Sequence, residues 1–179
     1  AASALMLALP GGAYLYQGEE LGLPEVVDLP DAARQDPTWF RTNGEKYGRD
    51  GCRVPIPWEA AAVGAGFNTT GEAWLPQPAN WGDFARDAEA TDPDSTLNLY
   101  TEALRLRRDH DLGAGNVHWV RGFRGTTVAL RNRDVLVIAN LGKKPAALPA
   151  GTVLLASGPL EADGSVTLLP SDTTVWLQG

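Results

Sequence analysis

The sequence contains few of the residues from which disulfide frameworks and metal sites are built. Its 179 residues include a single cysteine, Cys52, so an intramolecular disulfide and a cysteine-rich metal site are both excluded. Two histidines, His110 and His118, are too few to favour a zinc centre. We interpret Cys52 as a buried, inert thiol, and we expect the protein to use no metal and no cofactor.

Long apolar runs are also absent. The uncharged stretch before Glu19 is interrupted at Pro10-Gly11-Gly12, well short of the about 20 apolar residues that a membrane-spanning helix needs. The first residues lack the basic region of a signal peptide. We interpret residues 1–10 as the end of a buried helix that begins upstream of Ala1. We expect a cytoplasmic protein with no membrane partner.

Basic residues are outnumbered, and the charge is unevenly distributed. The net charge is −7 and the sequence pI is near 4.8, which argues against a nucleic-acid partner. Residues 1–110 hold 17 acidic and nine basic residues, whereas residues 111–179 hold five and six. This asymmetry predicts two units. The length also limits the fold, because a closed (β/α)₈ barrel needs about 250 residues, so any barrel feature here is part of a larger one.

Local patterns predict a change of architecture near residue 113. Residues 13–16 are a short apolar run that predicts a buried parallel strand after the Pro-Gly-Gly turn. Residues 24–84 are rich in proline and aromatic residues and have little periodicity, which predicts an ordered, packed loop. Capping residues and i, i+3, i+7 spacing predict a helix over 94–109.

Beyond residue 113 the apolar period becomes 2 and turn residues recur every eight to twelve positions. This pattern predicts a small antiparallel β-sandwich with its own core, able to fold alone. The expected strands are 117–120, 126–130, 135–139, 152–156, 166–169 and 174–177.

Three segments carry side chains that are typical of chemistry or binding. In Gln17-Gly-Glu-Glu20, adjacent carboxylates of an extended strand face opposite sides, so we favour a loop-ordering role over acid–base catalysis. In segment 48–58, Arg49 and Arg53 flank Asp50, and either an internal salt-bridge network or guanidinium groups aimed into a cleft would explain them. Segment 66–81 holds Trp74 and Trp81 among amide side chains, where loop packing is favoured over sugar stacking.

Four motifs follow one another along the chain. They are Gly-Gly-Ala-Tyr-Leu-Tyr-Gln-Gly-Glu-Glu-Leu-Gly-Leu-Pro (11–24), Gly-Arg-Asp-Gly-Cys-Arg-Val-Pro-Ile-Pro-Trp (48–58), Gly-Phe-Asn-Thr-Thr-Gly-Glu-Ala-Trp-Leu-Pro (66–76) and Asp-Pro-Asp-Ser-Thr-Leu-Asn-Leu-Tyr-Thr-Glu-Ala-Leu-Arg-Leu-Arg-Arg (92–108). Their order resembles the C-terminal third of glycoside hydrolase family 13, the α-amylase family, in its α-glucosidase and oligo-1,6-glucosidase branch. The Arg-Val-Pro-Ile-Pro-Trp variant resembles the actinobacterial type.

The resemblance implies an α+β chain with two domains. Residues 1–112 would be the C-terminal end of a catalytic (β/α)₈ barrel, with its last strand, a long loop and its last helix, and 113–179 an all-β C-terminal domain. It also implies that the catalytic carboxylates lie upstream, so that this chain holds no catalytic residue and is inactive alone. Arg49 resembles the family's glucose-binding arginine, with Asp50 and Arg53 in support.

The expected activity of the parent is that of a retaining α-glucosidase acting on short α-glucoside oligosaccharides, with the N-terminal barrel portion as this chain's partner. Within the same fold, trehalose synthase, sucrose isomerase and trehalose-phosphate hydrolase remain open. A non-catalytic family member with an interaction role is the alternative from another class. A third possibility is that the tail is a carbohydrate-binding module, whose tryptophans would be Trp119 and Trp176.

Overall fold

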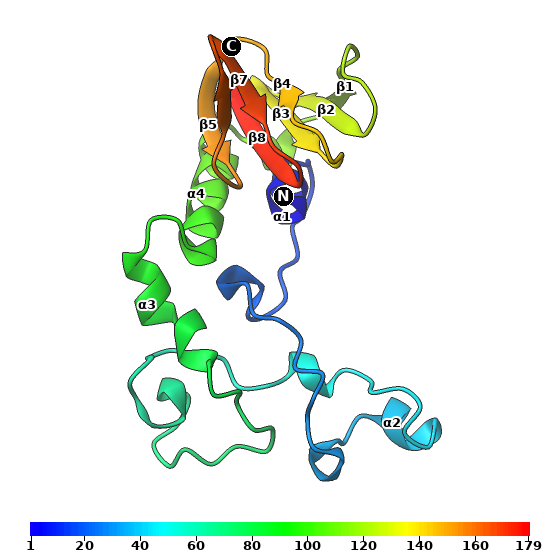
Figure 1. Cartoon of the computed structure of the whole chain (residues 1–179), viewed down its shortest axis with the longest axis vertical. Coiled ribbons are helices and arrows are strands. Elements are labelled where there is room, and N and C mark those ends of the chain that lie inside the picture. The colour runs from blue at the N-terminus through cyan, green and yellow to red at the C-terminus, as the bar shows by residue number, and fades with distance from the viewer. The chain divides into compact units, whose positions relative to one another are not determined.

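The computed structural model describes all residues from 1 to 179, which form two compact units (Figure 1). We call residues 1–14 with 99–179 the sheet unit, and residues 15–98 the turn unit. This division differs from the domain boundary predicted at 112/113, which remains a prediction. No helix in the chain is both long enough and apolar enough to cross a membrane.

Two antiparallel sheets make up most of the sheet unit, as the period-2 pattern predicted. All six expected strands are present, and two shorter ones, β4 and β6, were not predicted. The five-stranded sheet has the order β1 (Val117–Trp119), β2 (Thr127–Asn132), β3 (Val135–Asn140), β8 (Thr173–Gln178), β5 (Thr152–Ala156), and the three-stranded sheet has the order β4 (Ala146–Ala147), β7 (Val166–Leu169), β6 (Glu161–Asp163).

Strand β3 shows why the five-stranded sheet is covered on both faces. All six of its residues are buried, and successive side chains of a strand point to opposite faces. Val135 and Val137 join a cluster with helical residues, whereas Leu136 and Ile138 join a cluster that includes Leu169 of β7. One face therefore packs on the three-stranded sheet and the other on helices.

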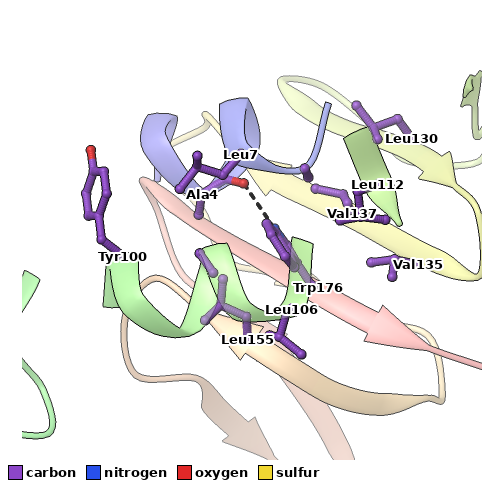
Figure 2. Packing of buried hydrophobic residues seen from close by; sticks show 12 residues of the cluster. Ala4, Leu7, Tyr100, Leu106, Leu112, Leu130, Val135, Val137, Leu155 and Trp176 are labelled. Carbon is purple, nitrogen blue, oxygen red and sulfur yellow. Dashed lines mark hydrogen bonds between the residues drawn. The ribbon is translucent and has the colours of Figure 1, made fainter. Parts of the chain in front are cut away.

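The helical cover comes from α1 (Ala2–Leu7) and from the sheet-unit part of α4 (Thr96–Asp109). Figure 2 shows the Trp176 indole at the centre of this cluster, with Ala4 and Leu7 on one side and Leu106 on the other. The indole Nε1 donates a 3.0 Å hydrogen bond to the Ala4 carbonyl. The predicted helix 94–109 is confirmed. The sandwich has the expected core between its two sheets. Helical side chains complete the other face of the five-stranded sheet, so the expectation that the sandwich folds alone stays a prediction.

The strand expected over Ala13–Tyr16 is also wrong for this structure. These residues have no regular secondary structure, and Tyr14 is 91% exposed. A parallel strand is held by hydrogen bonds to neighbouring strands. All eight strands of this chain belong to the two antiparallel sheets and pair only with one another, so the apolar run has no ladder to join.

The turn unit is built from short 3₁₀ turns and two short helices, α2 (Pro37–Arg41) and α3 (Arg86–Thr91). As predicted, it is ordered and packed, although it contains no strand. Its core is small and apolar, and consists of Val26, Leu29, Val54, Leu75 and Trp81, with Leu23 and Ala33 packed against them.

Candidate functional site

The segment from Gly48 to Arg53 is held in place by a buried carboxylate. Asp50 is fully buried, and its Oδ2 accepts 2.9 Å hydrogen bonds from the backbone N–H groups of Gln35 and Asp36. Its Oδ1 lies 3.3 Å from Nη1 of Arg53. A buried carboxylate is tolerated only with such partners, so Asp50 fixes segment 48–53 against residues 35 and 36.

Asp36 is a second carboxylate of the same network, and the sequence analysis missed it. Its Oδ1 accepts from Thr38 N at 2.8 Å and so caps α2, while its Oδ2 accepts from Arg49 N at 3.0 Å and from Arg53 Nη2 at 3.3 Å. The backbone hydrogen bonds from Thr38 and Arg49 hold the pKa of Asp36 below its usual value. Asp36-Pro37 is a helix-start signal that could have revealed this residue.

Gly48 allows the two segments to approach each other this closely. Its φ is +74°, and a Cβ at this position would lie 2.4 Å from the Asp36 Cγ atom. Any side chain would therefore push the Asp36 carboxylate away from the Arg49 backbone N–H.

The structure separates the three arginine and aspartate residues that the sequence grouped. Asp50 and Arg53 contact each other, and Asp36 completes the network. The Arg49 side chain lies outside it: it is exposed, it forms no ion pair, and its guanidinium carbon is 5.5 Å from the centroid of the Tyr16 ring. The network thus anchors the Arg49 backbone and leaves its guanidinium available.

A cation–π cluster in the same unit supports this arrangement. The Arg34 guanidinium carbon is 4.2 Å from the centroid of the Tyr47 ring and 5.2 Å from that of Trp39, and the two rings stack with their centroids 5.9 Å apart. Arg34 Nη2 donates to the carbonyls of Val27 and Leu29, both at 3.0 Å. Arg34 is almost fully buried, so this cluster orders the chain on either side of Asp36.

A cavity of about 260 Å³ lies close to this segment in the turn unit. Cys52 lines it and is half-buried, whereas the sequence suggested a buried thiol. Glu19 also lines it, and its Oε2 accepts a 3.0 Å hydrogen bond from Tyr16 N, the loop-ordering role expected for this carboxylate. The remaining lining residues are Tyr16, Gln17, Leu23, Pro24, Glu25, Gly51, Val54, Ile56 and Trp81.

The tryptophans of segment 66–81 act in packing. Trp81 is buried, and its Nε1 donates to the Pro55 carbonyl at 2.8 Å. Trp74 is half-exposed, and its Nε1 donates to the Ala33 carbonyl, also at 2.8 Å. Each indole therefore joins distant parts of the turn unit.

The histidines do not form a metal site. His110 Nδ1 lies 3.0 Å from both carboxylate oxygens of Asp134, and His118 lies exposed on β1. No group of three or more histidine, cysteine or carboxylate side chains has the geometry to hold a metal ion.

The chain thus combines a turn-rich unit ordered by buried carboxylates with a unit of two antiparallel sheets. Two protein families match the chain. The family described as "Alpha amylase, catalytic domain" matches residues 1–114, and the family described as "Domain of unknown function (DUF3459)" matches residues 110–176. The chain belongs to the α-amylase family, glycoside hydrolase family 13, and its relatives include oligo-1,6-glucosidases and α-glucosidases.

Similar proteins agree on this assignment. The chain is 33% identical to a probable α-glucosidase of Rhizobium meliloti over 171 residues, which cover 92% of the chain and 30% of that protein. It is 31% identical to an oligo-1,6-glucosidase of Parageobacillus thermoglucosidasius over 134 residues, 62% of the chain and 23% of that protein. The chain thus spans less than a third of the length of each of these relatives.

Solved structures share the fold. The α-glucosyl transfer enzyme XgtA is 31% identical and superposes with a TM-score of 0.79, over 99% of this chain and 35% of that one. A point mutant of MutB, from crystals soaked with trehalulose, has a TM-score of 0.78 at 22% identity, over 99% of this chain and 37% of that one.

Proposed function

We propose that this chain is the sugar-binding, closing part of a retaining α-glucosidase that acts on short α-glucosides. The acid, base and nucleophile of such a reaction are carboxylates placed on either side of the scissile bond. In this proposal they lie outside the 179 residues, and the chain alone does not hydrolyse substrate. The observation that carries the proposal is the network of the buried Asp36 and Asp50 carboxylates with Arg53, which fixes segment 48–53 and leaves the Arg49 guanidinium exposed and without an ion pair.

Arg49 is the substrate-binding residue in this proposal. A guanidinium presents several N–H donors in a planar fork, which suits the adjacent hydroxyl groups of a glucose ring. Asp50 and Arg53 do not touch the sugar. They hold the backbone from which Arg49 projects, and Asp36 does so directly through the Arg49 N–H.

The test is Arg49→Ala in the full-length enzyme. We expect kcat/KM for maltose or p-nitrophenyl α-glucoside to fall by about 10- to 100-fold, the effect of losing a charged hydrogen bond. The matched control is Arg41→Ala, since Arg41 is an exposed arginine of the same unit whose side chain donates a 3.4 Å hydrogen bond to the Thr38 hydroxyl. Unchanged kcat/KM in Arg49→Ala, or an equal loss in the control, would contradict the role of Arg49.

A second assay tests the division of labour. The isolated 179-residue chain should release no glucose from maltose or isomaltose, and the full-length enzyme should release it. Release of glucose by the chain alone would show that it contains catalytic groups of its own, against the proposal.

Transglycosylation is a second candidate activity, favoured by the 31% identity to a protein described as an α-glucosyl transfer enzyme. Product analysis separates the two activities. Free glucose as the main product of maltose supports hydrolysis, whereas longer or isomeric glucosides as the main product support transfer.

A further inference from the structure

The sheet unit contains a groove of about 480 Å³ beside the ends of β2 and β3. Volumes of this size are typical of small-molecule sites. Its walls are the loop of residues 122–126 with the start of β2, and the loop of residues 142–145 with β4. All of its residues fall in the part of the chain that matches a family of unknown function.

The groove is lined by cations and by no carboxylate. Arg124, Lys143 and Lys144 lie in its lining and are exposed, and none of them forms an ion pair in the structure. Thr126 and Thr127 also line the groove, and neither hydroxyl forms a hydrogen bond in the structure. In a chain of net charge −7, this is a local concentration of unneutralised positive charge.

The two loops are tied together before any ligand binds. Leu141 N donates to the Thr126 carbonyl at 3.2 Å, which links one loop to the other. Asn140, buried at the end of β3, donates from Nδ2 to the Lys144 carbonyl at 2.9 Å and accepts from Gly142 N at 3.0 Å. A Cβ at Gly142 would lie 2.3 Å from Thr126 Oγ1, so a side chain here would displace the Thr126 hydroxyl.

The donor set selects the charge and shape of a ligand. Three cations around one carboxylate would leave two positive charges unneutralised. A phosphate monoester carries a charge near −2 and presents three terminal oxygens, so it can accept from a guanidinium fork, ammonium groups and hydroxyls at once. The groove is also larger than a phosphate ion requires, which leaves room for the organic part of a phosphorylated molecule.

We propose that the groove formed by Arg124, Lys143 and Lys144 with the Thr126 and Thr127 hydroxyls binds the phosphate monoester group of a small phosphorylated metabolite. This site is independent of the α-glucosidase proposal, because every residue that forms it lies in the sheet unit and none of them is in segment 48–53. Its failure would leave the role of Arg49 untouched.

The test is a titration of the full chain at low ionic strength, followed by ³¹P chemical shift and by calorimetry. The probes are inorganic phosphate and glucose 6-phosphate, with glucose as the uncharged control. Both phosphates should bind and glucose should not. Tighter binding of glucose 6-phosphate identifies a phosphorylated sugar as the fitting ligand, and equal binding identifies recognition of the phosphate group alone; either result supports the proposal.

Two matched variant pairs locate the site. Arg124→Gln should weaken binding about tenfold or more. Arg121→Gln removes the same charge just before this loop, outside the groove lining, and should change binding less than about twofold. Lys143→Gln with Lys144→Gln should weaken binding more than Arg41→Gln with Arg86→Gln, which removes two charges from the turn unit.

The variants are surface substitutions, so folding should be unaffected, and circular dichroism checks this. Binding of neither phosphate overturns the proposal, as does an equal loss in the target and control variants. Binding of a poly-glutamate peptide with no binding of either phosphate also overturns it, and would assign the groove to an acidic protein partner instead.

Discussion

The sheet unit and the turn unit are stabilised in different ways. The sheet unit buries large apolar side chains on both faces of a five-stranded sheet, and seven acidic and nine basic residues give it a charge of +2. The turn unit has a core of five buried apolar residues, no strand, and 15 acidic and six basic residues, a charge of −9. In the turn unit, hydrogen bonds to buried carboxylates therefore provide part of the stabilisation that apolar burial provides in the sheet unit.

The two units are therefore vulnerable to different changes. Apolar burial is non-directional and spread over many contacts, so a single small change is partly absorbed. A buried carboxylate acts through a few directional hydrogen bonds, and loss of one partner leaves others unsatisfied. The sheet unit should therefore fail when a whole layer is removed, and the turn unit when one carboxylate is removed.

The largest expected effect is the loss of folding when residues 113–179 are expressed alone. Without α1 and α4, five buried side chains on one face of the sheet become exposed, and each is worth about 1.5–3 kcal/mol of burial. That loss is comparable with the whole stability of a small domain, about 5–15 kcal/mol. The affected residues are Leu130, Val135, Val137, Leu155 and Trp176.

Near-ultraviolet circular dichroism and thermal melting are the measurements. The full chain should melt cooperatively, with a structured signal from the tryptophans, and residues 113–179 alone should give neither. A cooperative transition in the isolated segment would show that the sandwich has a sufficient core of its own, and the comparison above would be wrong.

A smaller but still large effect is expected from Asp50→Ala. The substitution removes the acceptor of two backbone N–H groups and the partner of Arg53, and we expect a loss of about 2–4 kcal/mol. Hydrogen exchange should increase in the turn unit and remain unchanged in β3 and β8. The control is Asp31→Ala. Asp31 is exposed where it pairs with Arg34, so its substitution should reduce the free energy of unfolding by less than about 1 kcal/mol.

Local sequence patterns predicted the parts of the fold that local physics controls. The helix over 94–109 and the strand over 135–139 follow from capping and from apolar periodicity. The shared helix–sheet core was missed, although the continuous apolar run Val135-Leu-Val-Ile already indicates a strand buried on both faces. Which helices would cover the second face depends on contacts between distant residues, such as Trp176 with Ala4, and these have no local signal.

The candidate site was predictable to a similar extent. Segment 48–53 was found because arginine and aspartate cluster there in sequence. Asp36 was missed because its partners Arg49 and Arg53 lie 13 and 17 residues away in the sequence. The residues next to Asp36 predict only that it caps a short helix. The apolar run at 13–16 was predicted to be a strand because an apolar pattern indicates burial. A strand also requires neighbouring strands to pair with, and the pattern does not show whether they are present.

Removal of a buried hydrogen-bonding side chain in the sheet unit should have an intermediate effect on stability. Asn132 is fully buried, and its Nδ2 donates to the carbonyls of Ala8 at 2.8 Å and Leu112 at 3.0 Å. Asn132→Ala leaves the Ala8 carbonyl without its donor, whereas the Leu112 carbonyl still accepts from Gly115 N at 3.1 Å. We expect a loss of about 1–3 kcal/mol in urea unfolding. Asn116→Ala, an exposed asparagine near the start of β1, should change stability by less than about 0.5 kcal/mol. Equal effects would mean that the sheet unit depends on apolar burial alone.

The smallest expected effect is a difference in acid stability that follows from the lowered pKa of Asp36. Hydrogen bonds from the backbone N–H groups of Thr38 and Arg49 favour the folded carboxylate in its charged form. Between the lowered pKa in the folded state and the ordinary value of 3.8, the unfolded state binds more protons than the folded state. The free energy that Asp36 contributes to folding is therefore fully present above about pH 4–5, roughly one pH unit beyond the ordinary pKa. This contribution is lost as the pH falls through the lowered pKa of the folded state.

Asp36→Asn should reduce stability at neutral pH and flatten the acid limb of the stability curve for the turn unit, measured by hydrogen exchange between about pH 3 and pH 6, where carboxylates titrate. The asparagine oxygen can still accept one hydrogen bond, but its amide group presents N–H donors toward other N–H donors. Asp134→Asn is the matched substitution in the sheet unit: burial acts to raise the pKa of Asp134, but hydrogen bonds with His110 and Gln178 outweigh it and lower the pKa. Each variant should flatten the acid limb of the stability curve of its own unit only. If both variants flatten it in the same unit, the two units unfold as one cooperative structure and do not differ in the way described.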